Sequence, residues 1–119
     1  MDFSKFTDVV ADPPEAIIYA ALEVLKQGDN DGVIGFGGGS SMDTAKLIAL
    51  LANTGAKLED IYGVGIAKGQ RLPLILIPTT AGTGSEATAV AIVTTGETTK
   101  AGVVANQLYP DVALLDAEL

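Results

Sequence analysis

The chain has 119 residues, the size of one domain, and its 48% apolar and 18% charged residues are typical of a compact α/β protein rather than a disordered chain. Its 15 acidic residues outnumber the 7 basic ones, which are scattered, so the formal charge of −8 excludes binding to a nucleic-acid backbone. Histidine and cysteine are both absent, which excludes disulfides, thiolate metal sites and the usual general base at neutral pH.

Neither a membrane span nor a secretion signal is expected from the sequence. No apolar run approaches the length that crosses a bilayer, and residues 1–5 lack a basic region followed by an apolar core. We therefore expect no membrane partner and, by elimination, a cytoplasmic protein.

The first predicted elements are a short strand over residues 6–10 and a helix after it. Asp12 is expected at the helix N-cap, Pro13 in the first turn, and Glu15 as the second member of a pair like a capping box. An apolar face at spacings of three and four supports this helix, formed by Ile17, Ile18, Ala21, Leu22 and Leu25. Gly28 ends the helix and begins a polar turn.

A second strand and helix follow. Residues 33–36 form a continuous apolar run, which predicts a strand buried on both faces. After three glycines, Ser40 or Ser41 is expected to cap a helix that runs to about residue 53. Asp43 is expected in its first turn, where a carboxylate favours the helix dipole, and Lys46 one turn later pairs with it. The alternative for Lys46 is that it reaches a ligand.

The remaining elements follow from apolar runs and turn residues. In chain order we expect one helical turn at 58–62, a loop at 63–71, a buried strand at 74–77, a hairpin from 89–94 and 100–104, and a last strand at 112–115. The order β-α-β-α-β followed by a hairpin predicts a mainly parallel sheet with flanking helices.

Two glycine-rich segments follow predicted buried strands. The first is Gly37-Gly38-Gly39-Ser40, and the second is Thr79-Thr80-Ala81-Gly82-Thr83-Gly84-Ser85-Glu86. Exposed backbone amides in such turns cradle phosphates, and both turns are expected at the carboxyl edge of the sheet, where ligands bind. Two such turns close together suit a dinucleotide. Taken singly, either segment is also explained as a capped turn that binds nothing.

Neither segment is a standard nucleotide fingerprint. In the first, Ser40 occupies the third glycine position of the dinucleotide pattern, and no Gly-Lys-Ser/Thr of a P-loop follows. Residues 82–87 of the second match G-x-G-x-x-A, but a strand-like sequence follows them in place of a helix. We therefore interpret that match as accidental.

Together with the closing segment over residues 110–119, the two turns resemble the iron-containing alcohol dehydrogenase family, and the resemblance covers nearly the whole chain from Val9. Members have a Rossmann-like cofactor domain and an all-helical metal domain, and they interconvert alcohols with aldehydes or ketones using NAD or NADP. The resemblance implies that the cofactor is bound by Gly37, Gly38, Gly39, Ser40, Asp43, Thr79, Thr80 and Thr83, with Val93 and Lys100 toward the nicotinamide.

Two departures from the family pattern shape the expected function. The family has a strand and helix ahead of residues 6–10, and its metal ligands, an aspartate and three histidines, would fall beyond Leu119. The resemblance thus implies a single, partial dinucleotide-binding domain over 1–119, without iron or zinc and without activity alone. The uncovered sheet edge predicts a homo-oligomer.

Three readings of such a chain stay open at this point. It is the cofactor-binding half of an oxidoreductase that works with a separate metal-bearing chain, a non-catalytic nucleotide-binding or oligomerisation module, or a folded remnant that binds nothing.

Overall fold

The computed structural model describes residues 13–28, 32–78, 88–96 and 99–113. Their helices and strands are, in chain order, α1 (Glu15–Gln27), β1 (Val33–Gly37), α2 (Gly39–Thr54), η1 (Leu58–Asp60), β2 (Gly63–Val64), β3 (Leu74–Pro78), β4 (Val90–Thr94), β5 (Lys100–Val104), η3 (Asn106–Leu108) and β6 (Val112–Ala113). The predicted strand at 6–10 lies outside the described residues, as does the end of the strand predicted at 112–115.

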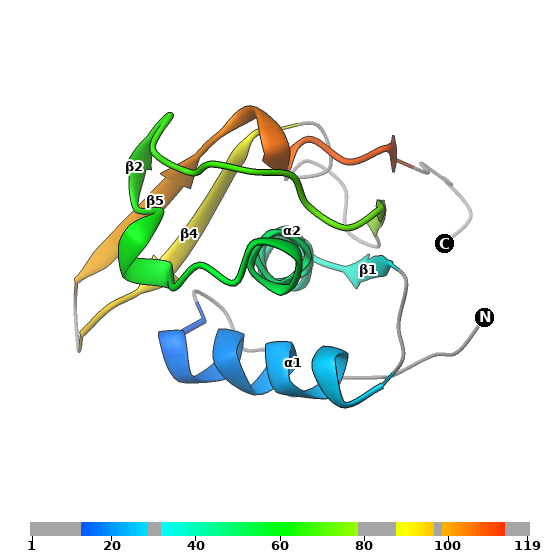
Figure 1. Cartoon of the computed structure of the whole chain (residues 1–119), viewed down its shortest axis with the longest axis horizontal. Helices are drawn as coiled ribbons and strands as arrows, with labels where there is room; N and C mark the ends of the chain where they lie inside the picture. The colour runs from blue at the N-terminus through cyan, green and yellow to red at the C-terminus, as the bar shows by residue number, and fades with distance from the viewer. Residues whose placement is uncertain (1–12, 29–31, 79–87, 97–98, 114–119) are drawn as a thin grey trace.

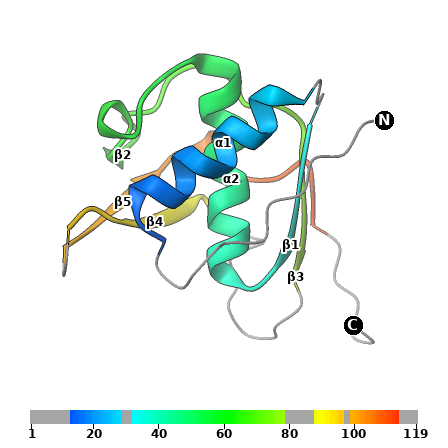
Figure 2. The ribbon, with the colours of Figure 1, turned by 90° about the horizontal axis from the view of Figure 1, so that it is seen from below.

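The described strands form two sheets of three strands each, with orders β1-β3-β6 and β2-β5-β4. Helix α2 lies between the sheets, with β1 on one side of it and the β4–β5 pair on the other, while α1 packs along α2 (Figures 1 and 2). The predicted α/β class is confirmed, with flanking helices, a mainly parallel arrangement and a hairpin. The division into two sheets was not predicted.

The first sheet is entirely parallel. Strand β1 pairs with β3 in a register that runs from Val33 opposite Leu74 to Gly37 opposite Pro78, and β3 pairs with β6. Parallel strands place their carboxyl ends at one edge, so the segments that follow β1 and β3 leave the sheet together.

The second sheet combines the predicted hairpin with a strand that was predicted as loop. Strands β4 and β5 are antiparallel, as expected, and β2 runs parallel to β5 within the segment 63–71. The loop prediction was wrong at Gly63 and Val64, which form β2. It missed this strand because the strand has only two residues, both exposed. Such a strand is held by backbone pairing alone and carries no apolar alternation that a sequence pattern could reveal.

The core is built around α2. Nine consecutive or near-consecutive residues of this helix are buried, because it packs against both sheets and against α1. The largest fully buried side chains are Lys46, Ile18, Met42, Leu47, Leu50, Leu51, Leu58, Leu74, Leu76, Leu108, Val93 and Val103. Among the described residues, no helix has the length and apolar character needed to span a membrane.

Helix α1 begins later than predicted. Its N-cap is Pro14, not Asp12, and no side chain caps it. A residue that precedes a proline is disfavoured in helical conformation, so Pro13 cannot supply the first turn ahead of Pro14. Glu15 makes no capping box and instead accepts a hydrogen bond of 3.0 Å from the Tyr62 hydroxyl. Burial and the nearby carboxylate raise the pKa of Tyr62.

Strand β1 corrects a second prediction, that it is buried on both faces. Its residues alternate, with Val33 and Gly35 buried and with Ile34 44% and Phe36 58% exposed. Helix α2 covers only the first of these faces. Val112, whose register partner on β3 is Ile75 opposite Ile34, is also 43% exposed. One face of the parallel sheet therefore presents apolar side chains to water.

Candidate dinucleotide site

The two glycine-rich segments begin side by side. Gly37, the last residue of β1, pairs in register with Pro78, the last residue of β3. The geometry predicted for the carboxyl edge is therefore confirmed for the points where the segments start. Thr79, Thr80 and Thr83 fall outside the described residues and stay predictions.

The first turn is a direct passage from strand to helix. Gly37 has φ of 139°, and a Cβ there would lie 3.0 Å from Oγ of Ser41. Only glycine adopts this conformation readily. Gly38 is the N-cap of α2 with φ of −84°, and its carbonyl accepts the Met42 amide at 3.1 Å.

The predicted serine cap is therefore wrong. The bond from the Met42 amide to Gly38 closes the first helical turn ahead of both serines, so Ser40 and Ser41 lie inside α2. The Ser40 carbonyl accepts a hydrogen bond of 2.9 Å from the Thr44 hydroxyl, as expected of a helical residue. The sequence pattern favoured serine because serine is the more frequent cap.

The N-terminus of α2 has the electrostatics of an anion site. No side chain caps it, and its first turn holds no acidic residue. The first amides of a helix have no partner within the helix, and aligned peptide dipoles give this end a partial positive charge. A phosphate is thus favoured locally although the whole chain carries −8.

Close packing at Gly35 fixes where this helix end lies. A Cβ on Gly35 would come within 2.7 Å of Cβ of Ala45 and of Cδ2 of Leu76. Any side chain there would push α2 away from the sheet or displace Leu76. The absence of a side chain at Gly35 therefore sets the distance between α2 and the β1–β3 pair.

The predicted pairing of Asp43 with Lys46 is confirmed, with 3.7 Å between Oδ1 and Nζ. Because α2 begins at Gly39, Asp43 lies beyond the first turn, and its predicted role at the helix dipole is wrong. Lys46 is fully buried and donates to the Val90 carbonyl at 3.0 Å and to the Thr88 hydroxyl at 3.2 Å. These two acceptors carry no signal in the sequence that could have predicted them.

A profile of the family described as iron-containing alcohol dehydrogenase matches residues 1–117. The chain belongs to this family. It is 38% identical over its whole length to the NAD-dependent methanol dehydrogenase of Bacillus methanolicus, and 43% identical over 96% of its length to long-chain-alcohol dehydrogenase 1 of Geobacillus thermodenitrificans. It spans only 32% and 29% of those two relatives.

Solved structures of the family agree. The chain superposes with a TM-score of 0.86 and 37% identity on a sulfoacetaldehyde reductase of Bifidobacterium kashiwanohense in complex with NAD⁺, covering 95% of this chain and 31% of that one. It matches an iron-containing alcohol dehydrogenase of Thermotoga maritima with a TM-score of 0.82 and 39% identity, over 93% of this chain and 30% of that one. The resemblance inferred from the sequence motifs is thus confirmed.

Two residues that the family pattern assigns to the cofactor lie apart from the glycine turn. Val93 is in β4 and Lys100 begins β5, on the side of α2 away from β1 and β3 (Figure 2). The Val93 side chain is fully buried, whereas Lys100 is exposed opposite Thr94. Of these two, only Lys100 presents its side chain at the surface.

The metal chemistry of the family has no fitting donors in the described ranges. Within them, no three His, Cys, Asp or Glu side chains come together in a group that could hold an ion. These residues thus offer no donor set for iron or zinc, and the expectation that the family metal does not bind this chain stays a prediction.

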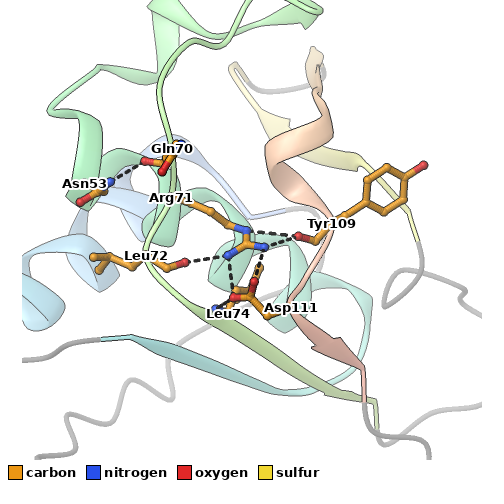
Figure 3. A network of polar contacts seen from close by, with 7 residues as sticks. All are labelled: Asn53, Gln70, Arg71, Leu72, Leu74, Tyr109 and Asp111. Carbon is orange, nitrogen blue, oxygen red and sulfur yellow. Dashed lines mark hydrogen bonds and ion pairs between the residues drawn. The ribbon is translucent and has the colours of Figure 1, made fainter.

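The opposite end of the parallel sheet carries a polar cluster that the sequence did not reveal. All five N–H groups of the Arg71 guanidinium are used: two reach the Asp111 carboxylate at 2.8 and 3.2 Å, and three reach the carbonyls of Tyr109 and Leu72 (Figure 3). Asp111 also accepts the Leu74 amide at 2.9 Å. The hydrogen bonds from Arg71 and then from this amide lower the pKa of the Asp111 carboxyl.

In this cluster, Arg71 and Asp111 connect the residues that precede β3 with those that precede β6. A cavity of about 320 Å³ lies beside it, lined by Gln70, Arg71, Pro73, Gln107 and Asp111. The guanidinium has no donor left for a ligand in this cavity, because protein oxygens take all five. Its position at the amino ends of β3 and β6 also places it away from the glycine turns.

Proposed function

We propose that this chain binds the diphosphate of NAD or NADP at the N-terminus of α2 and serves as the cofactor-binding part of an alcohol or aldehyde oxidoreductase. The observation that carries the proposal is the register pair of Gly37 with Pro78. It brings an uncapped helix N-terminus and the start of a second glycine- and threonine-rich segment to one sheet edge.

The residues of the first turn fit a diphosphate. Gly37 and Gly38 leave the backbone amides open to close approach, because neither carries a Cβ, and Gly39 and Ser40 begin the helix whose dipole favours the anion. We assign Thr79, Thr80 and Thr83 to the same cofactor, since hydroxyls beside a phosphate or ribose supply further hydrogen bonds. This chain has no histidine with which to assist proton transfer.

The reaction we propose for the full assembly is hydride transfer between an alcohol carbon and nicotinamide. The nicotinamide ring supplies the hydride chemistry when it is bound, and this chain orients the dinucleotide. Relatives are named for methanol, for sulfoacetaldehyde and for long-chain alcohols, which supports an alcohol or aldehyde as the substrate class without favouring a particular chain length. The described residues hold no donor set for a metal, so we expect cofactor binding without turnover by this chain alone.

The assembly and location we propose are those expected from the sequence. Among the described residues β1 is an edge strand of its sheet, and a strand edge that no neighbour covers invites pairing with another chain. We propose a homo-oligomer formed through this edge, a separate metal-bearing chain as catalytic partner, and the cytoplasm as compartment. Light scattering at high protein concentration that shows only monomers would contradict the homo-oligomer.

The first test of cofactor binding is calorimetric titration with NADH and NADPH. We expect saturable binding of at least one dinucleotide and a loss of at least about tenfold in affinity, or ~1.4 kcal/mol, in Gly38→Val, because the new side chain occupies the space of the phosphate. Gly28→Val is the matched control, because both glycines cap a helix end with an ordinary φ, −84° at Gly38 and −89° at Gly28. Gly28 caps the C-terminus of α1 and not the N-terminus of α2. Unchanged binding by Gly38→Val, or no binding by the wild type, overturns the proposal.

A further inference from the structure

An ion pair on α2, formed by the buried Lys46 and the partly exposed Asp43, covers the outer edge of β4. Odd-numbered residues of β4 and its flank bond to β5, as the bond from the Ala105 amide to the Ala89 carbonyl shows, so even-numbered residues face away from the hairpin. On that outer side, the Val90 carbonyl accepts from Lys46 at 3.0 Å and the Ile92 amide donates to Asp43 at 3.2 Å.

The pair supplies the hydrogen bonds of a missing strand. One residue of a parallel neighbour would donate to the carbonyl before its partner residue and accept from the amide after it. Around Ala91, Lys46 provides that donor and Asp43 that acceptor. The Thr94 amide continues the same edge by donating to the Pro13 carbonyl at 3.0 Å. Side chains of a helix thus complete the edge of β4.

Burying a charged side chain between α2 and β4 costs free energy of desolvation. The Lys46 side chain is 0% exposed, and a buried ammonium is stable only with good partners. An apolar side chain of similar length would pack between α2 and β4 without that cost, but it could not define the position of β4 along the helix. The directional bonds of Lys46 and Asp43 do so, since each reaches one particular backbone group.

The third bond of this set reaches Thr88, which lies two residues after the second glycine-rich segment. The Lys46 ammonium donates to the Thr88 hydroxyl at 3.2 Å, and Thr88 directly follows residues 79–87. The start of that segment is tied to the first turn by the pairing of Pro78 with Gly37. The described residues on either side of the second segment, Pro78 and Thr88, are therefore both bonded to the strand and helix that form the first turn.

We propose that Lys46 is a positioning residue for dinucleotide binding, which holds Thr88, just after the second glycine-rich segment, at a set distance from the N-terminus of α2. The inference rests on the proposed function. In that function a dinucleotide contacts both segments at once, so its affinity depends on the distance between them. A ligand that contacts only the first turn does not depend on the distance.

The test compares NADH with ADP on the full chain. Thr88→Val keeps the shape and removes the hydroxyl, and Thr88→Ser restores it. We expect Thr88→Val to weaken NADH binding about tenfold in calorimetry and ADP binding less than twofold, with Thr88→Ser within twofold of wild type for both. An equal loss for both ligands, or none for NADH, overturns the proposal. Lys46→Met is expected to show a larger NADH loss of the same selectivity.

A measurement without ligand separates this inference from the proposed function. Amide exchange followed by NMR is expected to speed up at least tenfold at Ile92 in Lys46→Met and threefold in Thr88→Val, and to stay unchanged at Leu22 in α1. If no form of the chain binds NADH, the proposed function fails, and fast local exchange still supports the positioning of β4 by Lys46. Unchanged exchange at Ile92 in both variants refutes that positioning.

Discussion

The two ends of the parallel sheet differ in the residues that surround them, with charged side chains at the amino end and glycines at the carboxyl end. At the amino end, all five N–H groups of Arg71 donate to Asp111 and to two carbonyls, so side-chain hydrogen bonds hold the strands together. At the carboxyl end, Gly37 and Gly38 lead into a helix that no side chain caps. Charged side chains bind the backbone groups of the amino end, whereas at the carboxyl end no side chain caps the helix.

With the cofactor at the carboxyl end, as we propose, one sheet separates stability from binding. Open amides at a helix end lose the stabilisation that a capping side chain would give, typically about 1 kcal/mol. A many-bonded guanidinium at the far end of the same strands offsets such a loss without entering the site. We therefore expect variants at the two ends to affect different measurements.

The largest expected effect is on stability, at the amino end. Arg71→Met should lower the free energy of unfolding by about 2–3 kcal/mol in urea titration, because it removes the five hydrogen bonds of a partly exposed guanidinium, each contributing roughly 0.5 kcal/mol. NADH affinity of the folded chain should change less than about twofold, or ~0.4 kcal/mol. Lys68→Met, which removes an exposed cation nearby in sequence, is the control. A large loss of NADH affinity in Arg71→Met would contradict the separation of stability at the amino end from binding at the carboxyl end.

A smaller effect should touch both measurements, at the carboxyl end. Gly37→Ala places a Cβ at φ of 139° and 3.0 Å from the Ser41 hydroxyl, so we expect a loss of about 2 kcal/mol in stability and weaker NADH binding. Gly55→Ala is matched, since its φ of 71° is also positive but nothing lies within 4 Å of the new Cβ. It should cost about 1 kcal/mol and leave binding unchanged. Equal effects of the two variants would argue against a tight turn at Gly37.

The smallest expected effect is the pH dependence at the amino end. The folded-state pKa of Asp111 is lowered, so its stabilisation is present above the ordinary carboxyl range and is lost as pH falls through the folded pKa, below about 4. The side chain is 53% exposed, and solvent screening keeps the contribution under ~1 kcal/mol. Asp111→Asn should flatten that part of the stability curve between pH 5 and pH 2, roughly the range where such carboxylates titrate. A curve with the wild-type slope would refute the role of Asp111.

Local sequence signals predicted most of the elements. Helical periodicity placed α1, the two apolar runs placed β1 and β3, and β-branched residues around a glycine turn placed the β4–β5 hairpin. The predicted N-termini of α1 and α2 were wrong, because backbone geometry and not the capping preference of side chains put the N-caps at Pro14 and Gly38. The strand β2 was missed because two exposed residues give no pattern, although their backbone pairs with β5.

The candidate site was predictable only in its local part. Consecutive glycines after an apolar run indicate a phosphate turn within a few residues of sequence. The contact of Lys46 with Thr88 joins residues 42 positions apart, and that of Arg71 with Asp111 joins residues 40 apart. Such contacts depend on how the sheets and α2 are arranged, which no local pattern encodes.

The exposed apolar face of the parallel sheet has a calorimetric consequence. Ile34, Phe36 and Val112 keep 44%, 58% and 43% of their surface in water in the folded chain. Apolar area that stays hydrated on folding contributes nothing to the heat-capacity change of unfolding, which for ordinary domains is about 12–15 cal/mol/K per residue. Covering these three side chains would therefore raise the heat-capacity change of unfolding by roughly a tenth or less, and with them exposed the stability should vary slightly less steeply with temperature on either side of its maximum.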